Sequence, residues 1–338
     1  MASPPYTVLV TGSSGHLGAA LMLTLPSLGH TPLGIDILPS ETTTTVGSIT
    51  DRDLVASILA DNPAISHVVH AATLHKPHVG SHPKSAFVET NITGTLVLLE
   101  EAARHLPRIR SFVFISTTST FGMALSPKPG QPAAWIDESV VPIPKNIYGV
   151  TKCAAEDVCG LVHRQTGLPV LVLRTSRFFP EPDDDEDRRA AMSDANLKVC
   201  ELAYRRADIA DVVSAVACAM GRAAALGWGK YVISAPPPFP RADAETLRRL
   251  DADAGAVLRE VLPGCEAVFE KLGWVFLARL DRVYDSSRAV RELGWRPEWT
   301  LEKVVERLGK GEAWRSELTD LVGRKGYHAV STGVYTTR

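Results

Sequence analysis

Residues 6–18 read Tyr-Thr-Val-Leu-Val-Thr-Gly-Ser-Ser-Gly-His-Leu-Gly, and this stretch decides the fold. Its first part, residues 6–10, is mostly apolar and β-branched, which predicts a strand. Gly12, Gly15 and Gly18 follow with a GxxGxxG spacing and lead into a helix. Glycines allow a tight turn and a close approach to a pyrophosphate, while a helix N-terminus offers N–H groups and partial positive charge. A strand, a glycine turn and a helix in this order predict a dinucleotide site.

Asp36 follows the next predicted strand, residues 33–35, and comes 24 residues after Gly12. A carboxylate at this place can accept hydrogen bonds from both hydroxyls of an adenosine ribose. The same charge repels a 2′-phosphate, so the sequence favours NAD over NADP as the cofactor.

The first half of the chain alternates short β-rich runs with longer helical patterns. Strands are predicted at residues 6–10, 33–35, 67–71, 110–116 and 169–173, and helices at residues 17–28, 51–60 with Thr50 as N-cap, 83–105 and 148–165. Alternation of this kind predicts parallel strands joined by crossover helices, which is an α/β, Rossmann-type doubly wound sheet.

After Arg174 the pattern loosens. Helices are predicted at residues 208–220, 242–261, 286–293 and 301–309, and a strand at residues 231–234. We therefore expect a Rossmann domain at residues 1–176, to which residues 203–236 return. A smaller, mostly helical substrate-binding lobe is expected at residues 177–202 and 237–338.

The bulk properties exclude several classes of protein. A length of 338 residues suggests about two domains, and a net charge of −2 gives no support for binding nucleic acid or an anionic membrane. No apolar run is recognised that reaches the ~18 residues of a membrane span, and residues 1–5 do not resemble a secretory signal. The five cysteines contain no CxxC pair, so neither a disulfide framework nor a metal site is expected, and the cytosol is the expected location.

Tyr148 and Lys152 form a YxxxK pair on the predicted helix 148–165. Residues four apart face the same side of a helix. A tyrosine normally titrates near pH 10, and a neighbouring ammonium group is expected to stabilise the phenolate and lower that pKa. The tyrosine could then take the proton from an alcohol during oxidation, or protonate an alkoxide in the reverse direction.

Further motifs lie in a fixed order along the chain. They are His70-Ala71-Ala72, the N-x-x-G-T pattern Asn91-Ile92-Thr93-Gly94-Thr95, the segment Ser116-Thr117-Thr118-Ser119-Thr120-Phe121-Gly122, Leu173-Arg174, Asp208-Ile209-Ala210-Asp211-Val212 and Leu293-Gly294-Trp295-Arg296-Pro297. Together with the glycine loop and the YxxxK pair, they make the chain resemble the extended short-chain dehydrogenase/reductase superfamily, in its NAD-dependent epimerase/dehydratase branch. The resemblance implies an NAD-dependent enzyme that oxidises or reduces a hydroxyl or ketone carbon.

The resemblance also implies roles for single residues. Thr117 would hydrogen-bond the substrate oxygen and align it with Tyr148, and Lys152 would also bind the nicotinamide ribose. Asn91 would support the backbone of the active site. Ile37, Ser48 and Ile49 would lie near adenine, Ala71, Ala72 and Thr73 would pass the middle of the cofactor, and His16, Leu17, Ser116 and Thr175 complete the expected cofactor site.

The substrate side departs from the family pattern. Nucleotide-sugar enzymes of this family usually carry an asparagine where this chain has Arg177. An arginine there could bind a carboxylate or phosphate in bidentate fashion, or it could pair with the acidic run at residues 183–187, which otherwise is expected to be a solvated surface segment. His75 and Ser119 are the other candidate substrate contacts, with a surface position the alternative for His75.

Three functions fit these motifs. The first is an enzyme of the epimerase or dehydratase type that acts on a sugar-like or polyhydroxylated small molecule and regenerates NAD in place. The second is a net NAD(H)-dependent alcohol dehydrogenase or ketone reductase. The third is a non-catalytic NAD-sensing regulator, which retention of Thr117, Tyr148 and Lys152 disfavours. Relatives often form homodimers through two long helices, which would be residues 83–105 and 148–165 here.

Overall fold

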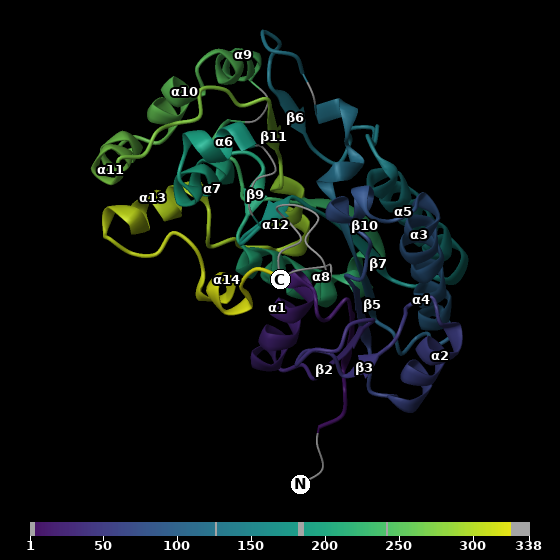
Figure 1. Ribbon diagram of the computed structural model, residues 1–338. Coiled ribbons are helices and arrows are strands. Elements are labelled where there is room, and N and C mark those ends of the chain that lie inside the picture. Colours follow the sequence, from purple (N-terminus) through teal and green to yellow (C-terminus); the bar gives the residue numbers. More distant parts are fainter. Residues whose placement is uncertain (1–3, 126, 182–185, 241–242, 326–338) are drawn as a thin grey trace.

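The structure is a computed structural model that describes residues 4–125, 127–181, 186–240 and 243–325. At its centre is a parallel seven-stranded sheet in the order β10-β7-β5-β4-β1-β2-β3 (Figure 1). Its strands are β1 (Val8–Thr11), β2 (Pro32–Asp36), β3 (Thr45–Val46), β4 (His67–His70), β5 (Ser111–Thr117), β7 (Val170–Thr175) and β10 (Trp228–Ile233). The chain starts in the interior of the sheet and winds outward in both directions, which confirms the doubly wound, Rossmann-type fold.

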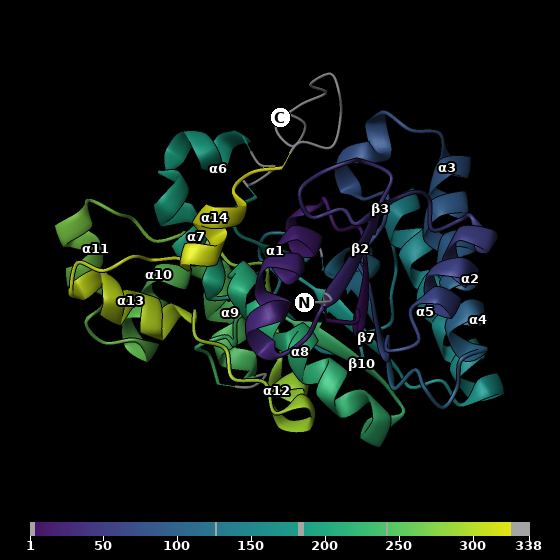
Figure 2. The ribbon, with the colours of Figure 1, turned by 90° about the horizontal axis from the view of Figure 1, so that it is seen from below.

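Helices cover both faces of the sheet, as Figure 2 shows in a view from below. One face carries α2 (Arg52–Asp61), α4 (Gly94–Ala103) and α5 (Ile147–Thr166), and the other carries α1 (His16–Thr24), α8 (Ile209–Leu226) and α12 (Ser287–Leu293). Strand β1 supplies both layers, because Leu9 packs toward α2 and α4 while Val8 and Val10 pack toward α1 and α8. A strand buried on both faces reads as a continuous apolar run, which is why residues 6–10 were recognisable.

The helix predicted at residues 83–105 is interrupted. It consists of α3 (Lys84–Val88), a single π-helical segment η3 (Glu89–Thr93) and α4. A π-turn holds one residue more than an α-turn and often lies at a functional site. Here the π segment contains Asn91, whose side chain is almost completely buried and reaches into the active-site wall.

Two sequence expectations about helix ends were wrong. Helix α2 is capped by Asp51 and not by Thr50, because the Asp51 carboxylate accepts the N–H of Leu54 at 3.1 Å while the Thr50 hydroxyl bonds that of Ser48. The helix expected at residues 242–261 is two helices, α9 (Ala244–Ala252) and α10 (Ala254–Val261). They are separated at Asp253, whose side chain caps α10.

Helix α8 corrects the expectation about apolar runs. It has 18 residues and a mean hydropathy of 1.6, so by length and composition alone it could cross a membrane. Only Asp211 and Arg222 carry charge within it, near opposite ends. Half of the helix is buried, and it packs against β5 and α1 as the central helix of one face of the sheet. The same length and composition therefore suit a core helix.

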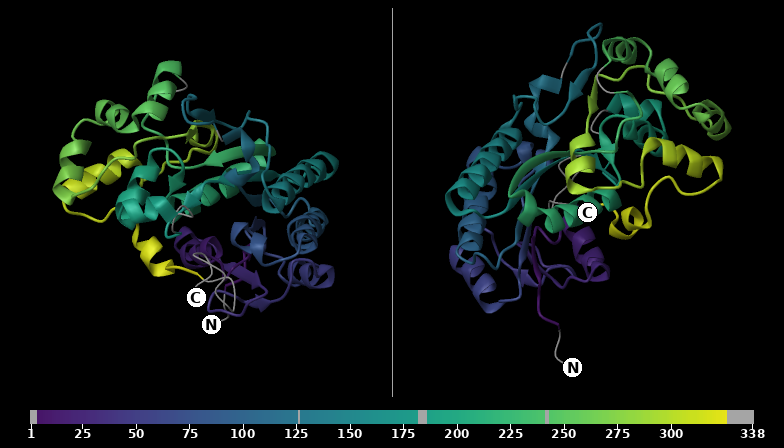
Figure 3. Two further views of the ribbon diagram at one scale, coloured as in Figure 1. Left: turned by 45° about the horizontal axis from the view of Figure 1, so that its top comes forward. Right: turned by 180° about the vertical axis from the view of Figure 1, so that it is seen from behind.

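A second, mostly helical region lies beside the carboxyl edge of the sheet, as Figure 3 shows from two further sides. Its helices are α6 (Glu186–Ala191), α7 (Asp194–Leu202), α9, α10, α11 (Cys265–Leu272), α13 (Leu301–Gly309) and α14 (Glu317–Val322). Two small parallel sheets accompany them, β6 (Ala134–Ile136) with β11 (Arg282–Tyr284) and β8 (Arg177–Phe178) with β9 (Arg206–Ala207). The short helical turns are η1 (Leu25–Leu28), η2 (Lys76–Gly80), η4 (Thr118–Thr120) and η5 (Met123–Leu125).

The apolar contacts show which segments of the chain pack in the core of each region. The helical region has its own core, which includes Phe179, Leu250 and Phe269. Trp295, which follows α12, is instead fully buried in the core beside α8, where its indole N–H donates to the Asp211 carbonyl at 3.0 Å. The division at residues 176, 203 and 236 stays a prediction, and these contacts add that the segment after residue 286 packs partly on the Rossmann sheet.

Candidate active site

A cleft of about 660 Å³ runs along the carboxyl ends of the strands, where parallel sheets of this type bind their ligands. Most of the site residues predicted from the sequence line it. They are Gly12, Gly15, His16, Leu17, Gly18, Asp36, Ile37, Ser48, Ile49, Ala71, Ala72, Thr73, His75, Ser116, Thr117, Ser119, Tyr148, Thr175 and Arg177. Asn91 and Lys152 lie directly behind the wall, at 2% exposure each, and touch the residues that form it.

The glycine loop is compressed between β1, β4 and α1. Gly12 has a φ of 73°, and a Cβ added there would lie 2.7 Å from the backbone nitrogen of Ala72. A Cβ on Gly18 would overlap the carbonyl oxygen of Gly12. Gly15 is the N-cap of α1, and in the described chain no side chain accepts a hydrogen bond from this helix end. The N–H groups of Gly12, Ser13, Ser14 and Gly15 donate to the backbone or to Asp36, so the part of this segment that suits a pyrophosphate is the first turn of α1, which lines the cleft.

Asp36 ties the glycine loop to the end of β2. Its carboxylate accepts the N–H of Ser14 at 3.0 Å and the N–H of Leu38 at 2.9 Å. These bonds hold the carboxylate at the cleft wall next to exposed Ile37. The position suits acceptance of hydrogen bonds from a ribose, as the sequence predicts.

A buried polar chain explains the His70-Ala71-Ala72 motif. The imidazole of His70 hydrogen-bonds the hydroxyl of Thr11 at 2.8 Å and the hydroxyl of Thr95 at 2.9 Å. Thr11 also accepts the N–H of Ala72 at 3.1 Å. Burial lowers the pKa of His70 well below its usual range, and the nearby charge of Lys152 lowers it further. A neutral imidazole thus links β1, β4 and the helix behind them.

Asn91 supports the wall from behind. Its side-chain oxygen accepts from the Thr73 hydroxyl and from the Leu74 N–H, both at 2.9 Å. Its side-chain amide donates to the Leu74 carbonyl at 2.9 Å and to the Thr151 hydroxyl on α5 at 3.0 Å. One side chain therefore fixes the loop after β4 against the helix that carries Tyr148.

Tyr148 and Thr117 meet in the cleft. Asn146 caps α5 by accepting the N–H of Gly149 at 3.0 Å, and a Cβ on Gly149 would lie 2.8 Å from the carbonyl oxygen of Ser119. The first turn of α5 is thus pressed against the segment after β5, and the Thr117 hydroxyl lies close enough to the Tyr148 phenol to lower its pKa.

The pKa of Tyr148 moves opposite to the sequence expectation. Burial raises it above its usual value, and the hydrogen bond from Thr117 only partly offsets this effect. The expected lowering by Lys152 considered charge alone and left out desolvation, which penalises a buried phenolate. In the chain without ligands the tyrosine is therefore a protonated phenol.

Lys152 is held beneath the site. Its ammonium nitrogen donates to the carbonyl oxygen of Ile115 at 2.6 Å and lies 4.0 Å from the centre of the Phe114 ring. Burial lowers the pKa of Lys152 to about 7. The lysine thus joins α5 to β5 next to both catalytic candidates.

A buried ion pair that the sequence analysis missed stabilises the end of β5. Glu156 accepts the hydroxyl of Ser116 at 2.6 Å and an N–H of Arg174 at 2.7 Å, and Lys230 lies 3.0 Å away. Burial alone would raise the pKa of Glu156, but the bond and charge of Arg174 outweigh it and the pKa is lowered. Leu173-Arg174 was noted only as a motif, because its partner on α5 has no signature of its own.

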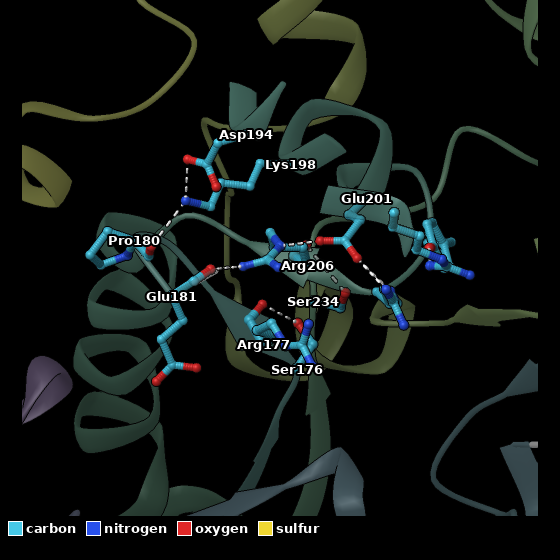
Figure 4. A network of polar contacts seen from close by, with 12 residues as sticks. Ser176, Arg177, Pro180, Glu181, Asp194, Lys198, Glu201, Arg206 and Ser234 are labelled. Carbon is cyan, nitrogen blue, oxygen red and sulfur yellow. Dashed lines mark hydrogen bonds and ion pairs between the residues drawn. The ribbon is translucent and has the colours of Figure 1, made fainter. Parts of the chain in front are cut away.

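The substrate end of the cleft adds residues that the sequence did not reveal. They are Lys76, Pro77, His78, Lys145, Asn146, Phe178, Glu181, Arg205, Arg282 and Tyr284, with Leu38, Leu74 and Thr90 closer to the cofactor side. Figure 4 shows how Arg206 organises this end, since it lies between Glu201 and the backbone of Glu181 while the Glu181 carboxylate extends away from it. That carboxylate lies 3.8 Å from the Nδ1 atom of His16.

Two sequence features are only partly visible. Residues 183–185 of the acidic run lie outside the described residues, so its pairing with Arg177 stays a prediction. Of the C-terminal tail, residues 326–338 also lie outside them. The last described residue, Lys325, donates its backbone N–H to the Nε2 atom of His16 at 2.7 Å, at the edge of the cofactor cleft.

Two curated proteins illustrate the sequence relationships. A dTDP-glucose 4,6-dehydratase of Streptomyces niveus is 34% identical over 195 residues, which are 51% of this chain and 54% of that protein. A UDP-glucose 4-epimerase of Rhizobium leguminosarum bv. trifolii is 30% identical over 179 residues, 50% of each chain. The chain thus spans about half the length of the curated relatives it matches.

Solved structures extend the likeness over most of the chain. UDP-glucose 4-epimerase of Thermotoga maritima superposes with a TM-score of 0.59 at 22% identity and covers 90% of this chain and 99% of that one. UDP-glucose 4-epimerase of Brucella ovis, solved with NAD, gives a TM-score of 0.60 at 19% identity over 89% and 96%. At these identities the likeness establishes the fold.

The sequence model of one family, described as the NAD dependent epimerase/dehydratase family, matches residues 8–232. The match contains the glycine loop, Asp36, Thr117, Tyr148 and Lys152. It confirms the resemblance inferred from the motifs and, with it, an enzyme family whose cofactor is NAD. The chain belongs to the NAD dependent epimerase/dehydratase family.

Proposed function

We propose that this chain is an NAD-dependent enzyme of the epimerase or dehydratase type, which oxidises a hydroxyl carbon of a sugar-like or polyhydroxylated small molecule. The observation that carries the proposal is the meeting of the Thr117 and Tyr148 hydroxyls in the cleft, with Lys152 one helical turn further on. A secondary alcohol beside these two hydroxyls would be oriented and deprotonated at one oxygen atom.

The glycine loop, the start of α1 and Asp36 fit a dinucleotide. The glycine loop leaves no room for a Cβ at Gly12 or Gly18, the start of α1 presents N–H groups, and Asp36 faces the adenosine end. Ile37, Ser48 and Ile49 would surround adenine, while Ala71, Ala72 and Thr73 would flank the middle of the cofactor. NAD, when bound, supplies the hydride acceptor.

Thr117, Tyr148, Lys152 and Asn91 would then have separate roles in the reaction. The Thr117 hydroxyl would donate to the substrate oxygen and keep it beside Tyr148. The Tyr148 oxygen would take the proton of the substrate hydroxyl and return it when the carbonyl is reduced again. Lys152 would supply the positive charge that favours the phenolate, and a cationic partner drawn toward the phenol lowers the pKa that burial raises. The side-chain hydrogen bonds of Asn91 would keep the loop after β4 and helix α5 in place.

Retention of NAD separates the epimerase or dehydratase reaction from a net dehydrogenase. The backbone N–H of Lys325 donates to His16 at the start of α1, and this contact at the edge of the cofactor cleft favours retention. Native mass spectrometry of the purified protein, followed by spectroscopy of what denaturation releases, tests this point. One NAD per chain supports recycling in place, whereas an empty site that binds NADH reversibly supports a net dehydrogenase or reductase.

Turnover tests the central assignment. A Tyr148→Phe variant should lose conversion of the substrate, measured as product formed, while keeping its affinity for NAD. If the variant turns over like the unaltered protein, the assigned chemistry is wrong. If the unaltered protein binds NAD but converts none of a broad panel of sugar-like substrates into product, a non-catalytic sensing role is favoured.

The proposal includes a cytosolic location and a homodimer, neither of which enters the argument for the chemistry. All five cysteines are free, which suits a reducing compartment. Val88 at the end of α3 and Val150 and Leu161 on α5 are each more than 40% exposed, which suits pairing of these helices between two copies. Light scattering coupled to size-exclusion chromatography would give the mass in solution, and a monomer would remove the dimer from the proposal.

A further inference from the structure

The carboxylate of Glu181 reaches the start of α1, the part of the cleft that suits the pyrophosphate of NAD. Its Oε1 atom lies 3.8 Å from the Nδ1 atom of His16, which is the first residue of that helix. Both residues line the cleft. Arg206 donates to the backbone carbonyl of Glu181 at 2.7 Å, and Figure 4 shows the carboxylate pointing away from this arginine. A pyrophosphate is itself negatively charged, so a carboxylate at this place opposes its binding for as long as it is ionised.

Positive charges act on Glu181 from several sides without outweighing its burial. Within the described residues, no group donates a hydrogen bond to its carboxylate. The cations whose charge lowers its pKa come from four elements and are Arg177 of β8, Arg206 of β9, Lys198 of α7 and Lys76 of η2. Burial is the larger effect, and the pKa of Glu181 is raised. A carboxyl group of this kind in a cleft is a candidate for exchanging a proton when a ligand binds.

His16, the group that faces Glu181 from α1, is held as a neutral imidazole. The backbone N–H of Lys325 donates to its Nε2 atom at 2.7 Å, so the proton of the neutral ring is on Nδ1, the atom nearer to Glu181. Burial, with the charge of Lys325 as a smaller cause, lowers the pKa of His16 to about 4. A second proton on this ring would go to Nε2 and displace the bond from Lys325. A proton taken up here is therefore better accommodated by the Glu181 carboxyl.

Bound NAD would add negative charge beside a carboxylate that burial already penalises. A like charge disfavours the ionised form, so the cofactor increases the proton affinity of Glu181 further. Thermodynamic linkage then requires the converse, that a protonated Glu181 favours bound NAD. The protonated carboxyl also has an O–H that can donate to a phosphate oxygen, whereas the ionised carboxylate only accepts.

We propose that NAD binds together with a proton from solvent, which the Glu181 carboxyl holds and through which it donates a hydrogen bond to the pyrophosphate. The inference adds a cofactor contact that lies outside the glycine loop. It rests on the proposed function for one consequence, which concerns Tyr148. The negative charge of Glu181 contributes to the raised pKa of Tyr148, so neutralising this charge when NAD binds makes the phenolate easier to form.

Isothermal titration calorimetry tests the coupling in the full chain after bound nucleotide has been removed. NAD is titrated in PIPES and in Tris, because buffers with different enthalpies of ionisation reveal the number of protons taken up. We expect uptake of up to one proton per NAD at a pH above 4.5, the ordinary value for glutamate. The affinity for NAD should fall as the pH rises between the pKa values of Glu181 in the free and the NAD-bound protein, by at most about tenfold per pH unit.

Two glutamine variants locate the proton. Glu181→Gln keeps the shape of the side chain but has no titrating group, so the proton uptake and the pH dependence of the NAD affinity should both disappear. Glu138→Gln is the matched control, because burial also raises the pKa of Glu138, which accepts the N–H of Val232 at 2.8 Å outside the cleft. This variant should take up as many protons as the unaltered protein does.

Three results would overturn the inference. They are the absence of proton uptake in the unaltered protein, uptake that persists in Glu181→Gln and so belongs to another group such as His16, and tighter binding of NAD as the pH rises. Because these titrations do not involve turnover, they can fail while Tyr148→Phe still abolishes conversion of the substrate. If Glu181 takes up the proton and Tyr148→Phe stays active, the inference stands and the proposed function fails.

Discussion

The ammonium nitrogen of Lys152 lies 2.6 Å from the backbone carbonyl oxygen of Ile115, two residues before Thr117 on β5. The bond joins the helix that carries Tyr148 to the strand that carries Thr117, so one contact fixes the spacing of both hydroxyls. The cost is a buried cation, and burial accordingly lowers the pKa of Lys152 to about 7.

The low pKa of Lys152 predicts how stability depends on pH in the protein without NAD. Between the folded pKa near 7 and the ordinary lysine value of about 10.4, the unfolded chain binds more protons than the folded chain. Stability contributed by this group therefore rises as the pH rises through that window, by at most about 1.4 kcal/mol per pH unit. Urea unfolding at several pH values between neutral and moderately alkaline measures the slope.

A Lys152→Met variant is the control for this linkage, because the ionisable groups other than the neighbours Cys159 and His70 titrate alike in both proteins. The difference in unfolding free energy between the unaltered protein and the variant should grow with pH in favour of the unaltered protein. Parallel pH curves would show that Lys152 keeps an ordinary pKa in the fold.

Removal of the reacting hydroxyls should affect turnover without affecting cofactor binding. Tyr148→Phe and Thr117→Val should each reduce kcat by about 100- to 10,000-fold, the usual contribution of a positioned proton-transfer group. Steady-state kinetics measures kcat, and titration with NAD measures the affinity for the cofactor. Tyr231→Phe removes a hydroxyl that bonds Glu292 at 2.9 Å outside the cleft, and it should leave both quantities near those of the unaltered protein. A comparable loss in Tyr231→Phe would mean that the measurement reports general damage.

Asp36 should decide between the two nicotinamide cofactors. Asp36→Ala removes an acceptor for the ribose and also the anchors of Ser14 and Leu38, so NAD affinity should fall by about tenfold or more, as hydrogen bonds to charged groups are worth roughly 1.5–3 kcal/mol. The affinity for NADP should fall less, because the repulsion of its 2′-phosphate is lost as well. Fluorescence titration with NADH and NADPH gives the ratio, with Asp61→Ala at the exposed end of α2 as the control. An unchanged ratio would remove Asp36 from the ribose site.

The sequence predicted the parts of the site that have local signatures. Gly12 and Gly18 are recognisable because no other residue fits between β1, β4 and α1. Asp36 and Thr117 end strands and Tyr148 lies at the start of a helix, all with clear periodicity, and the carboxyl ends of parallel strands meet at one edge. Each of them lines the cleft that the structure shows.

The substrate end could not be predicted in the same way. Arg177 and Arg206 become neighbours through strands of two residues each, which are too short to give any periodic pattern. Arg282 reaches the cleft from β11, a three-residue strand that pairs with β6 from a distant part of the chain. The raised pKa of Tyr148 likewise depends on burial that only the assembled fold creates. Contacts between short, distant segments leave no local trace in the sequence.

Gly18 provides the sharpest test of the dinucleotide site, because one added methyl group should be enough to disrupt it. In Gly18→Ala the new Cβ would overlap the carbonyl oxygen of Gly12 and lie 2.8 Å from the Cα of Ser13, so the loop must shift. Overpacking of this kind typically destabilises a fold by about 1–3 kcal/mol, and the shift should abolish NAD binding.

Gly221→Ala is the matched control, since this glycine lies inside α8 with no atom within 4 Å of an added Cβ. Alanine there should stabilise the protein by up to about 1 kcal/mol through helix propensity and leave NAD affinity unchanged. Chemical denaturation and NAD titration of both variants give the comparison. If Gly18→Ala bound NAD as well as Gly221→Ala does, close approach of β1 and α1 would not be what the third glycine provides.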